Sequence, residues 1–137
     1  MSGTSENALV LLAKAHDDYY ALTHLAEDQA VSIWIIGFHA QQTVEKSIKA
    51  VLLSCGITYP FTHDLELLIK LLQKNGLSLP PKIENIPLLT AFGTVFRYGE
   101  EDEGPVSMDR DWMKAVSKEV IAWAESIIGL TQTNGLP

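Results

Sequence analysis

Cysteine is nearly absent from this chain, since Cys55 is the only one among 137 residues. A single cysteine forms no internal disulfide and provides no cysteine-based zinc site. Long apolar runs are missing too: the longest, near residues 31–40, contains Ser32 and His39 and falls short of the about 18 residues that span a bilayer. The N-terminus has no positively charged leader. We therefore expect a cytoplasmic protein without a membrane span.

Positive charge is also scarce. The chain has 10 Lys and Arg against 17 Asp and Glu, for a formal net charge of -7. Proteins that coat nucleic acid need clustered Lys and Arg on a broad surface, so this class is disfavoured, although one local basic cleft remains open. With 47% apolar and 20% charged residues, the composition fits an ordinary globular protein. Its length predicts a single domain over residues 1–137, with a core at about 5–128 and polar tails.

Several motifs of catalysis and metal binding are missing. The sequence contains no Gly-rich phosphate loop, no G-x-S-x-G and no H-E-x-x-H. His63 and Asp64 together suggest a metal site, but no second histidine stands at helical spacing from His63. We expect instead that Thr62 or Asp64 caps a helix and that His63 forms a hydrogen bond to a neighbouring helix. No metal and no cofactor are predicted.

Apolar residues recur at helical spacing along most of the chain, without the alternation typical of strands. Ser5 is a predicted N-cap, Gly56 ends the second helix, and Pro87 kinks or delays the fourth. The tail after Gly129 is expected to fray. Short connections predict an all-α, up-and-down bundle in which the first two helices pack antiparallel. The predicted helices cover about residues 5–27, 31–55, 64–74, 80–98 and 109–128.

The second predicted helix has two distinct faces when its residues are placed 100° apart. One face is a core stripe of Val44, Ile48, Val51 and Cys55, with Ile33, Gly37 and Leu52 beside it. The other face carries His39, Gln42, Lys46 and Lys49, with Ile35 and Phe38 on or next to it. Two interpretations remain open. Either the bundle surrounds the first half of this helix, or the second face lies in an interface or cleft where the two lysines supply positive charge.

Three pieces of the chain form a recognisable set: the run Gln41-Gln42-x-x-Glu45-Lys46-x-x-Lys49-Ala50, the sequence Thr62-His63-Asp64-Leu65, and the pair Arg97-Tyr98. Together they resemble HEPN domains over about residues 8–128. The resemblance implies a small up-and-down helical bundle that forms a homodimer. It also implies a prokaryotic protein, often encoded beside a minimal nucleotidyltransferase as a toxin–antitoxin-like pair. Many HEPN proteins are metal-independent ribonucleases, marked by an Arg and, after four to six intervening residues, a His.

This sequence departs from the ribonuclease signature. In such a signature the His serves in acid–base chemistry and the Arg steadies the phosphate charge. Counting from Arg97, the histidine would fall at Asp102, Glu103 or Gly104, and counting from Arg110 it would fall at residues 115–117, which are Ala, Val and Ser. The four carboxylates of residues 100–103 should also repel an RNA backbone. We therefore predict no catalytic residues and a protein that is not a self-sufficient enzyme.

The resemblance, taken with the missing ribonuclease signature, implies a HEPN-type binding or regulatory protein whose partner is a minimal nucleotidyltransferase. It would hold a nucleotide or an RNA segment in a dimer cleft. A metal-independent RNA endonuclease is the alternative, in which Arg97 works with His63 or His39 as a non-standard acid or base. A structural dimer module is a third possibility, and Arg97 could instead form an ion pair with Glu45 or a loop carboxylate. The predicted cleft residues are Gln42, Glu45, Lys46, Lys49, His63, Arg97 and Tyr98.

Overall fold

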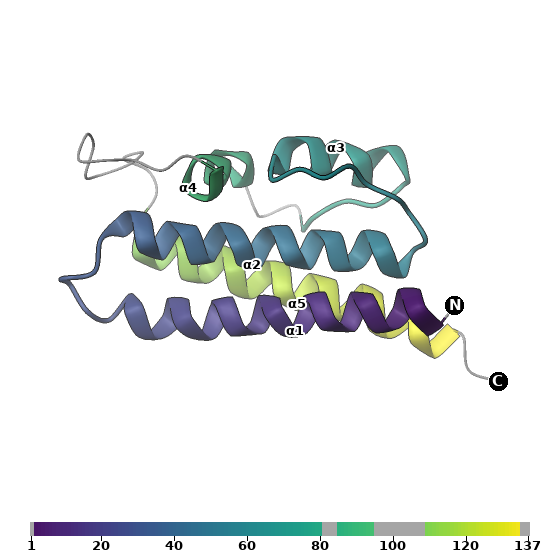
Figure 1. Cartoon of the computed structure of the whole chain (residues 1–137), viewed down its shortest axis with the longest axis horizontal. Coiled ribbons are helices and arrows are strands. Elements are labelled where there is room, and N and C mark those ends of the chain that lie inside the picture. Colours follow the sequence, from purple (N-terminus) through teal and green to yellow (C-terminus); the bar gives the residue numbers. More distant parts are fainter. Residues whose placement is uncertain (1, 81–84, 95–108, 135–137) are drawn as a thin grey trace.

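The chain folds into a bundle of α-helices (Figure 1). The computed structural model describes residues 2–80, 85–94 and 109–134, with side chains for 7–80, 85–93 and 109–129. These ranges contain no strand, so the all-α prediction is confirmed. None of the described helices is long and apolar enough to cross a membrane. The elements are α1 (Ser2–Leu25), α2 (Ile33–Ser54), α3 (Leu65–Lys74), the 3-10 helix η1 (Ile86–Leu89), α4 (Thr90–Thr94) and α5 (Arg110–Asn134).

Helix α2 occupies the middle of the bundle (Figure 1). It runs antiparallel to α1, as the short connection between them predicts, and α5 packs along both. The short helices α3 and α4 lie on the opposite side of α2 from α1. The core therefore forms around α2, and each fully buried Leu or Ile contributes about 1.5–3 kcal/mol. The largest of these buried side chains are Leu22, Ile36, Ile48, Leu52, Leu65, Leu68, Leu72, Ile86 and Leu89.

Helix α2 ends in a turn that reverses the chain toward α3. Gly56 has a φ of 75°, in the left-handed region that glycine adopts without steric cost. The Ile57 amide donates to the Leu52 carbonyl at 2.8 Å, which is the long hydrogen bond of a Schellman cap. Helix α3 then begins after Asp64, whose carboxylate accepts from the Glu66 amide at 3.1 Å. The predictions of an α2 end at Gly56 and a cap at Asp64 are confirmed.

Three other predictions, all for residues near helix ends, are wrong. Ser5 is not an N-cap, because α1 already begins at Ser2 and no proline interrupts that first turn. Helix α5 does not stop before Gly129 but continues to Asn134, since a glycine in an exposed helix weakens it by only about 1 kcal/mol. Cys55 is exposed and not in the core, because it is the C-cap residue at which the chain leaves the helix.

The fourth predicted helix is much shorter than expected in its described part. Of the predicted range 80–98, residues 81–84 and 95–98 lie outside the described residues. Asn85 has a left-handed φ of 68°, which interrupts any helix starting at Pro80. Pro87 lies in the first turn of η1, where its missing N–H is harmless, and α4 follows. The sequence predicts either a kink or a delayed start at Pro87, and the start of η1 at Ile86 matches the delayed start.

Two glycines let α4 pack directly against α2. A Cβ atom on Gly37 would lie 2.3 Å from Cδ1 of Phe92, and one on Gly93 would lie 2.2 Å from Cδ of Gln41. Phe92 also packs against Trp34, with ring centroids 4.4 Å apart. Because neither position has room for a methyl group, the contact between α4 and α2 depends on both glycines.

Arg110, the first residue of α5, holds the connection between α1 and α2. Its Nη1 donates to the carbonyls of Ala26 at 3.0 Å and Asp28 at 3.1 Å, and its Nη2 donates to the carbonyl of Val31. We expect Arg110→Ala to lower the free energy of unfolding by about 1–2 kcal/mol, because these carbonyls lose a charged donor. Urea unfolding followed by circular dichroism measures the change.

The matched control for Arg110 is Lys114, one turn further along α5. Its Nζ lies 3.9 Å from a carboxylate oxygen of the exposed Asp111, a geometry that contributes little in water. Lys114→Ala should therefore change stability by less than about 0.5 kcal/mol. Equal losses in the two variants would show that the hydrogen bonds of Arg110 do not hold the connection.

Candidate functional site

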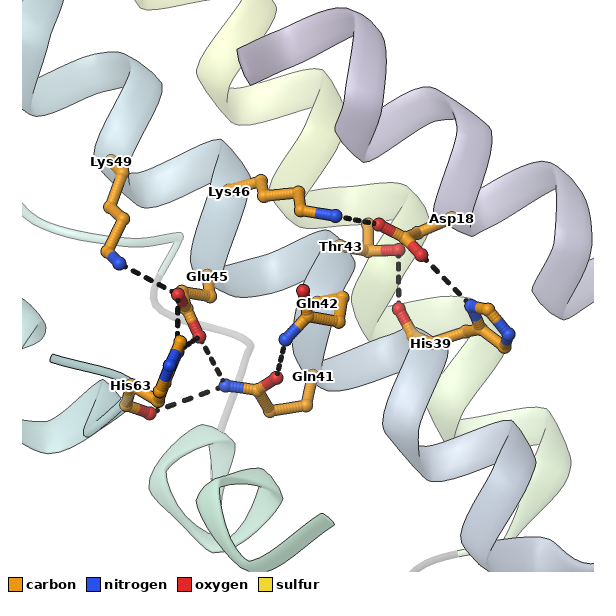
Figure 2. Close-up of polar contacts among 9 residues, drawn as sticks. All are labelled: Asp18, His39, Gln41, Gln42, Thr43, Glu45, Lys46, Lys49 and His63. Carbon is orange, nitrogen blue, oxygen red and sulfur yellow. Dashed lines mark hydrogen bonds and ion pairs between the residues drawn. The ribbon is translucent and has the colours of Figure 1, made fainter. Parts of the chain in front are cut away.

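A buried carboxylate, Glu45, gathers polar side chains from two parts of the chain (Figure 2). Gln41 and Lys49 stand four residues before and after it, so the three side chains share one side of α2. Glu45 accepts hydrogen bonds from Gln41 Nε2 at 2.7 Å and from Lys49 Nζ at 2.8 Å. The Nδ1 atom of His63, just before α3, lies 3.0 Å from both of its oxygens. We call these four residues the Glu45 cluster.

His63 connects this cluster to solvent. The Glu45 side chain is 5% exposed, whereas that of His63 is 44% exposed. Gln41 Nε2 donates to the His63 carbonyl oxygen at 3.3 Å. The Oε1 atom of Gln41 accepts from Gln42 Nε2 at 2.7 Å. The ring and the backbone of His63 are therefore both held from α2. When Nδ1 carries the proton toward Glu45, Nε2 remains to accept or exchange a proton with a ligand.

The surroundings of Glu45 keep it ionised. Burial by itself raises the pKa of Glu45, but hydrogen bonds from Lys49, Gln41 and His63 and the charge of Lys49 outweigh it, so the pKa is lowered overall. Nearby, burial and the Glu45 charge raise the pKa of Tyr59, whose ring centroid lies 5.5 Å from Lys49 Nζ. At neutral pH the cluster thus holds a carboxylate matched by an ammonium group.

A second carboxylate, Asp18 of α1, binds two other residues of α2. Its Oδ1 lies 2.9 Å from His39 Nδ1, and its Oδ2 accepts from Lys46 Nζ at 2.6 Å (Figure 2). Burial raises the pKa of Asp18, but the hydrogen bonds and charges of His39 and Lys46 lower it by more. Thr43 donates to the His39 carbonyl at 2.8 Å. This Asp18 cluster (Asp18, His39 and Lys46) joins α1 to α2.

The structure divides the predicted cleft between the two clusters. Glu45, Lys49 and His63 contact one another, and Gln42 joins them through Gln41. Lys46 turns instead toward α1, so it is not next to Lys49 (Figure 2). The expected hydrogen bond from His63 to a neighbouring helix is confirmed by its contact with Glu45. The other two predicted residues, Arg97 and Tyr98, lie outside the described residues.

Two members of these clusters were not predicted from the sequence. Gln41 is fully buried although it is polar, and its spacing of four from Glu45 was the available signal. Asp18 had no comparable signal, because its partners are 21 and 28 residues away along the chain. Within the described residues, no three His, Cys, Asp or Glu side chains are placed to hold a metal ion.

The lowered carboxylate pKa values predict a loss of stability in acid. The folded state favours the ionised forms, so this stabilisation is complete above the ordinary pKa values of 3.8 for Asp18 and 4.5 for Glu45. It disappears as the pH falls through the lower folded-state values. We expect the free energy of unfolding, measured in urea between pH 7 and pH 3, to decrease below about pH 4.5.

Amide variants test the source of this pH dependence. The double variant Asp18→Asn, Glu45→Gln should be less stable at pH 7 and should lose less stability in acid than the wild type. Glu66→Gln is the control, because Glu66 is exposed and its oxygen lies 3.6 Å from Lys70 Nζ. If the double variant keeps the wild-type slope, the two clusters are not the source.

Comparison with known proteins adds a family to this geometry. A family model for the HEPN domain matches residues 8–133. No curated protein and no solved structure gave a significant match. The match covers α2, α3, α4 and the connection before α3, which together carry the Glu45 cluster and the helix packed on it. Because it spans nearly the whole of a chain that folds as a helical bundle, this chain belongs to the HEPN domain family.

Proposed function

We propose that this chain is a HEPN-type binding or regulatory protein that holds a nucleotide or an RNA segment beside His63. We further propose that it acts as a homodimer in the cytoplasm of a prokaryote, as the partner of a minimal nucleotidyltransferase in a toxin–antitoxin-like system. Its family supports a helical regulatory or ribonuclease-like protein. The partner and the ligand are our inference from the resemblance and from the Glu45 cluster.

The main support for this proposal is the half-exposed imidazole of His63, which is held by a buried carboxylate whose charge is balanced by Lys49. Glu45 already accepts hydrogen bonds from Gln41 and Lys49, so its charge is shielded from a ligand. His63 reaches solvent with its ring position fixed, and a fixed donor loses little entropy when a phosphate or base binds. The cluster therefore offers an imidazole to a ligand, and not a bare carboxylate.

Arg97 and Tyr98 belong to the proposed site because of their place in the sequence. They follow α4, whose Gly93 packs against Gln41, a member of the Glu45 cluster. An Arg guanidinium is the side chain best suited to phosphate. The proposed site thus comprises Gln42, Glu45, Lys49, His63, Arg97 and Tyr98. Lys46, the remaining predicted residue, belongs to the Asp18 cluster instead.

Binding measurements with single variants test the site. We expect His63→Ala and Arg97→Ala each to weaken the binding of AMP or a short oligoribonucleotide about tenfold, because each loses one charged or polar contact. Lys70→Ala is the control, since Lys70 is exposed on α3 and pairs only weakly with Glu66. If both site variants bind as the wild type does, the proposal fails. Lys46→Ala separates the clusters, since Lys46 contacts Asp18 and should affect binding less.

A metal-independent RNA endonuclease is a second candidate, favoured by the contact between His63 and Glu45. A carboxylate that holds Nδ1 orients the imidazole and leaves Nε2 free for proton transfer, with Arg97 to stabilise phosphate charge. His39, held by Asp18 in the same way, is the other acid or base to consider. Incubation with RNA in EDTA tests this function. Cleavage that is lost in both His63→Ala and Arg97→Ala would favour the enzyme, and absence of cleavage would exclude it.

A further inference from the structure

Phe61 is the most exposed large apolar side chain in the described part of the chain. It is 94% exposed, compared with 67% for Tyr20, the next in order. It lies in the connection between α2 and α3, two residues before His63. A phenylalanine kept almost entirely in water gains nothing from burial in this fold, so its ring is available to a partner.

The connection that carries Phe61 is held firmly at both ends. On the α2 side, the Ile57 amide donates to the Leu52 carbonyl at 2.8 Å. On the α3 side, the Asp64 amide donates to the Thr62 hydroxyl at 3.0 Å, and His63 is fixed to Glu45. Because the backbone on both sides of Phe61 is already fixed, less entropy is lost when a partner binds to the ring.

The immediate neighbours of Phe61 suit a flat, neutral group. Its ring centroid lies 5.7 Å from that of His63, with the two planes at 67°. The carboxylates of Asp64 and Glu66, which follow Phe61 within five residues at the start of α3, would repel a phosphate placed on the ring. A nucleobase is planar, uncharged and rich in hydrogen-bonding edges, and aromatic side chains stack with any base.

We propose that Phe61 and His63 form a platform for one nucleobase, with the base stacked on Phe61 and its edge hydrogen-bonded to the imidazole. This inference rests on the proposed function and names the part of the ligand that contacts the α2–α3 connection. The phosphate is then directed away from Asp64 and Glu66. A base bound in this way is recognised mainly by stacking, so purines, which have the larger rings, bind better than pyrimidines.

Small probes separate base recognition from phosphate recognition. Adenosine, which has a base but no phosphate, should bind and shift the ring signals of Phe61 in aromatic NMR spectra. Ribose 5-phosphate, which has a phosphate but no base, should not shift them. Phe61→Leu keeps apolar bulk without an aromatic face and should weaken adenosine binding about 5- to 100-fold, whereas Phe61→Trp should retain it. Because Phe61 is exposed, these changes should not unfold the protein.

Tyr20→Leu is the matched control, as it removes an exposed aromatic ring from α1 without touching the platform. Equal adenosine binding by wild type and Phe61→Leu would overturn the inference. If AMP still bound and His63→Ala weakened it, the proposed function would stand without the platform. If neither AMP nor an oligoribonucleotide bound, both would fail. A Phe61→Leu variant that lost a protein partner but kept adenosine would also overturn it, and would assign Phe61 to a protein contact.

Discussion

Glu45→Ala is expected to lower the free energy of unfolding by about 3–5 kcal/mol, the usual loss when one member of a buried ion pair is removed. The variant leaves Lys49 with a buried charge and no carboxylate, and it also removes the acceptor of Gln41 and His63. Because domains of this size are stable by only about 5–15 kcal/mol, much of the total would be lost. Urea unfolding at pH 7 measures this change.

Two further variants separate the missing charge from the missing side chain. The double variant Glu45→Gln, Lys49→Met removes both charges. It should be more stable than Glu45→Ala, because no unpaired ion remains buried. Glu66→Ala removes a carboxylate at the same i, i+4 spacing from a lysine, but on the exposed surface of α3. It should cost less than about 0.5 kcal/mol. A similar loss for Glu66→Ala and Glu45→Ala would contradict the importance of burial.

Gly37→Ala is expected to cost about 1–3 kcal/mol, because its methyl group would lie 2.3 Å from a ring carbon of Phe92. Phe92 is buried against Trp34, so the ring cannot move without shifting α4. Displacement of α4 would also remove the contact between Gly93 and Gln41 beside His63. We therefore expect weaker AMP binding as well as lower stability, measured by titration and by urea unfolding.

A matched glycine provides the control for this prediction. Gly129 lies exposed within α5, and a Cβ atom there would have no neighbour within 4 Å. Gly129→Ala should therefore stabilise the protein, by up to about 1 kcal/mol, through helix propensity alone. Adding Phe92→Leu to Gly37→Ala should recover part of the lost stability by making room for the methyl group. Gly37→Ala with wild-type stability and binding would refute the close packing of α4 on α2.

The fold was predictable from the sequence wherever the signals were local. Helical periodicity, the capping residue Asp64 and the left-handed glycine Gly56 depend on neighbours within a few residues. The errors occurred at helix ends, where Ser5 and Gly129 resemble caps and stops. A helix passes through such residues when no other interaction favours leaving it, and the sequence does not specify that balance.

The site was only partly predictable, because its contacts cross between helices. Helical angles place Gln42 and Lys49 on one face of α2, and the resemblance adds Glu45 and His63, but the ion pair between Glu45 and Lys49 was not predicted. The partner of Lys46 could not be deduced, since Asp18 reaches it only when α1 packs antiparallel at one particular register. Helical angles place Lys46 and Lys49 on the same broad face. Lys46 nevertheless contacts Asp18 of α1, whereas Lys49 contacts Glu45 of α2 itself.

The division of α2 between two clusters has an evolutionary consequence. Lys46 follows Glu45 directly, yet one contacts α1 and the other contacts His63, so both clusters depend on the same helical register. Inserting or deleting one residue between His39 and Lys46 would rotate the second half of the helix by about 100° relative to the first. Asp18 could not then bind both His39 and Lys46. Insertions and deletions should therefore accumulate in the connections among relatives, while the length of this stretch of α2 is preserved.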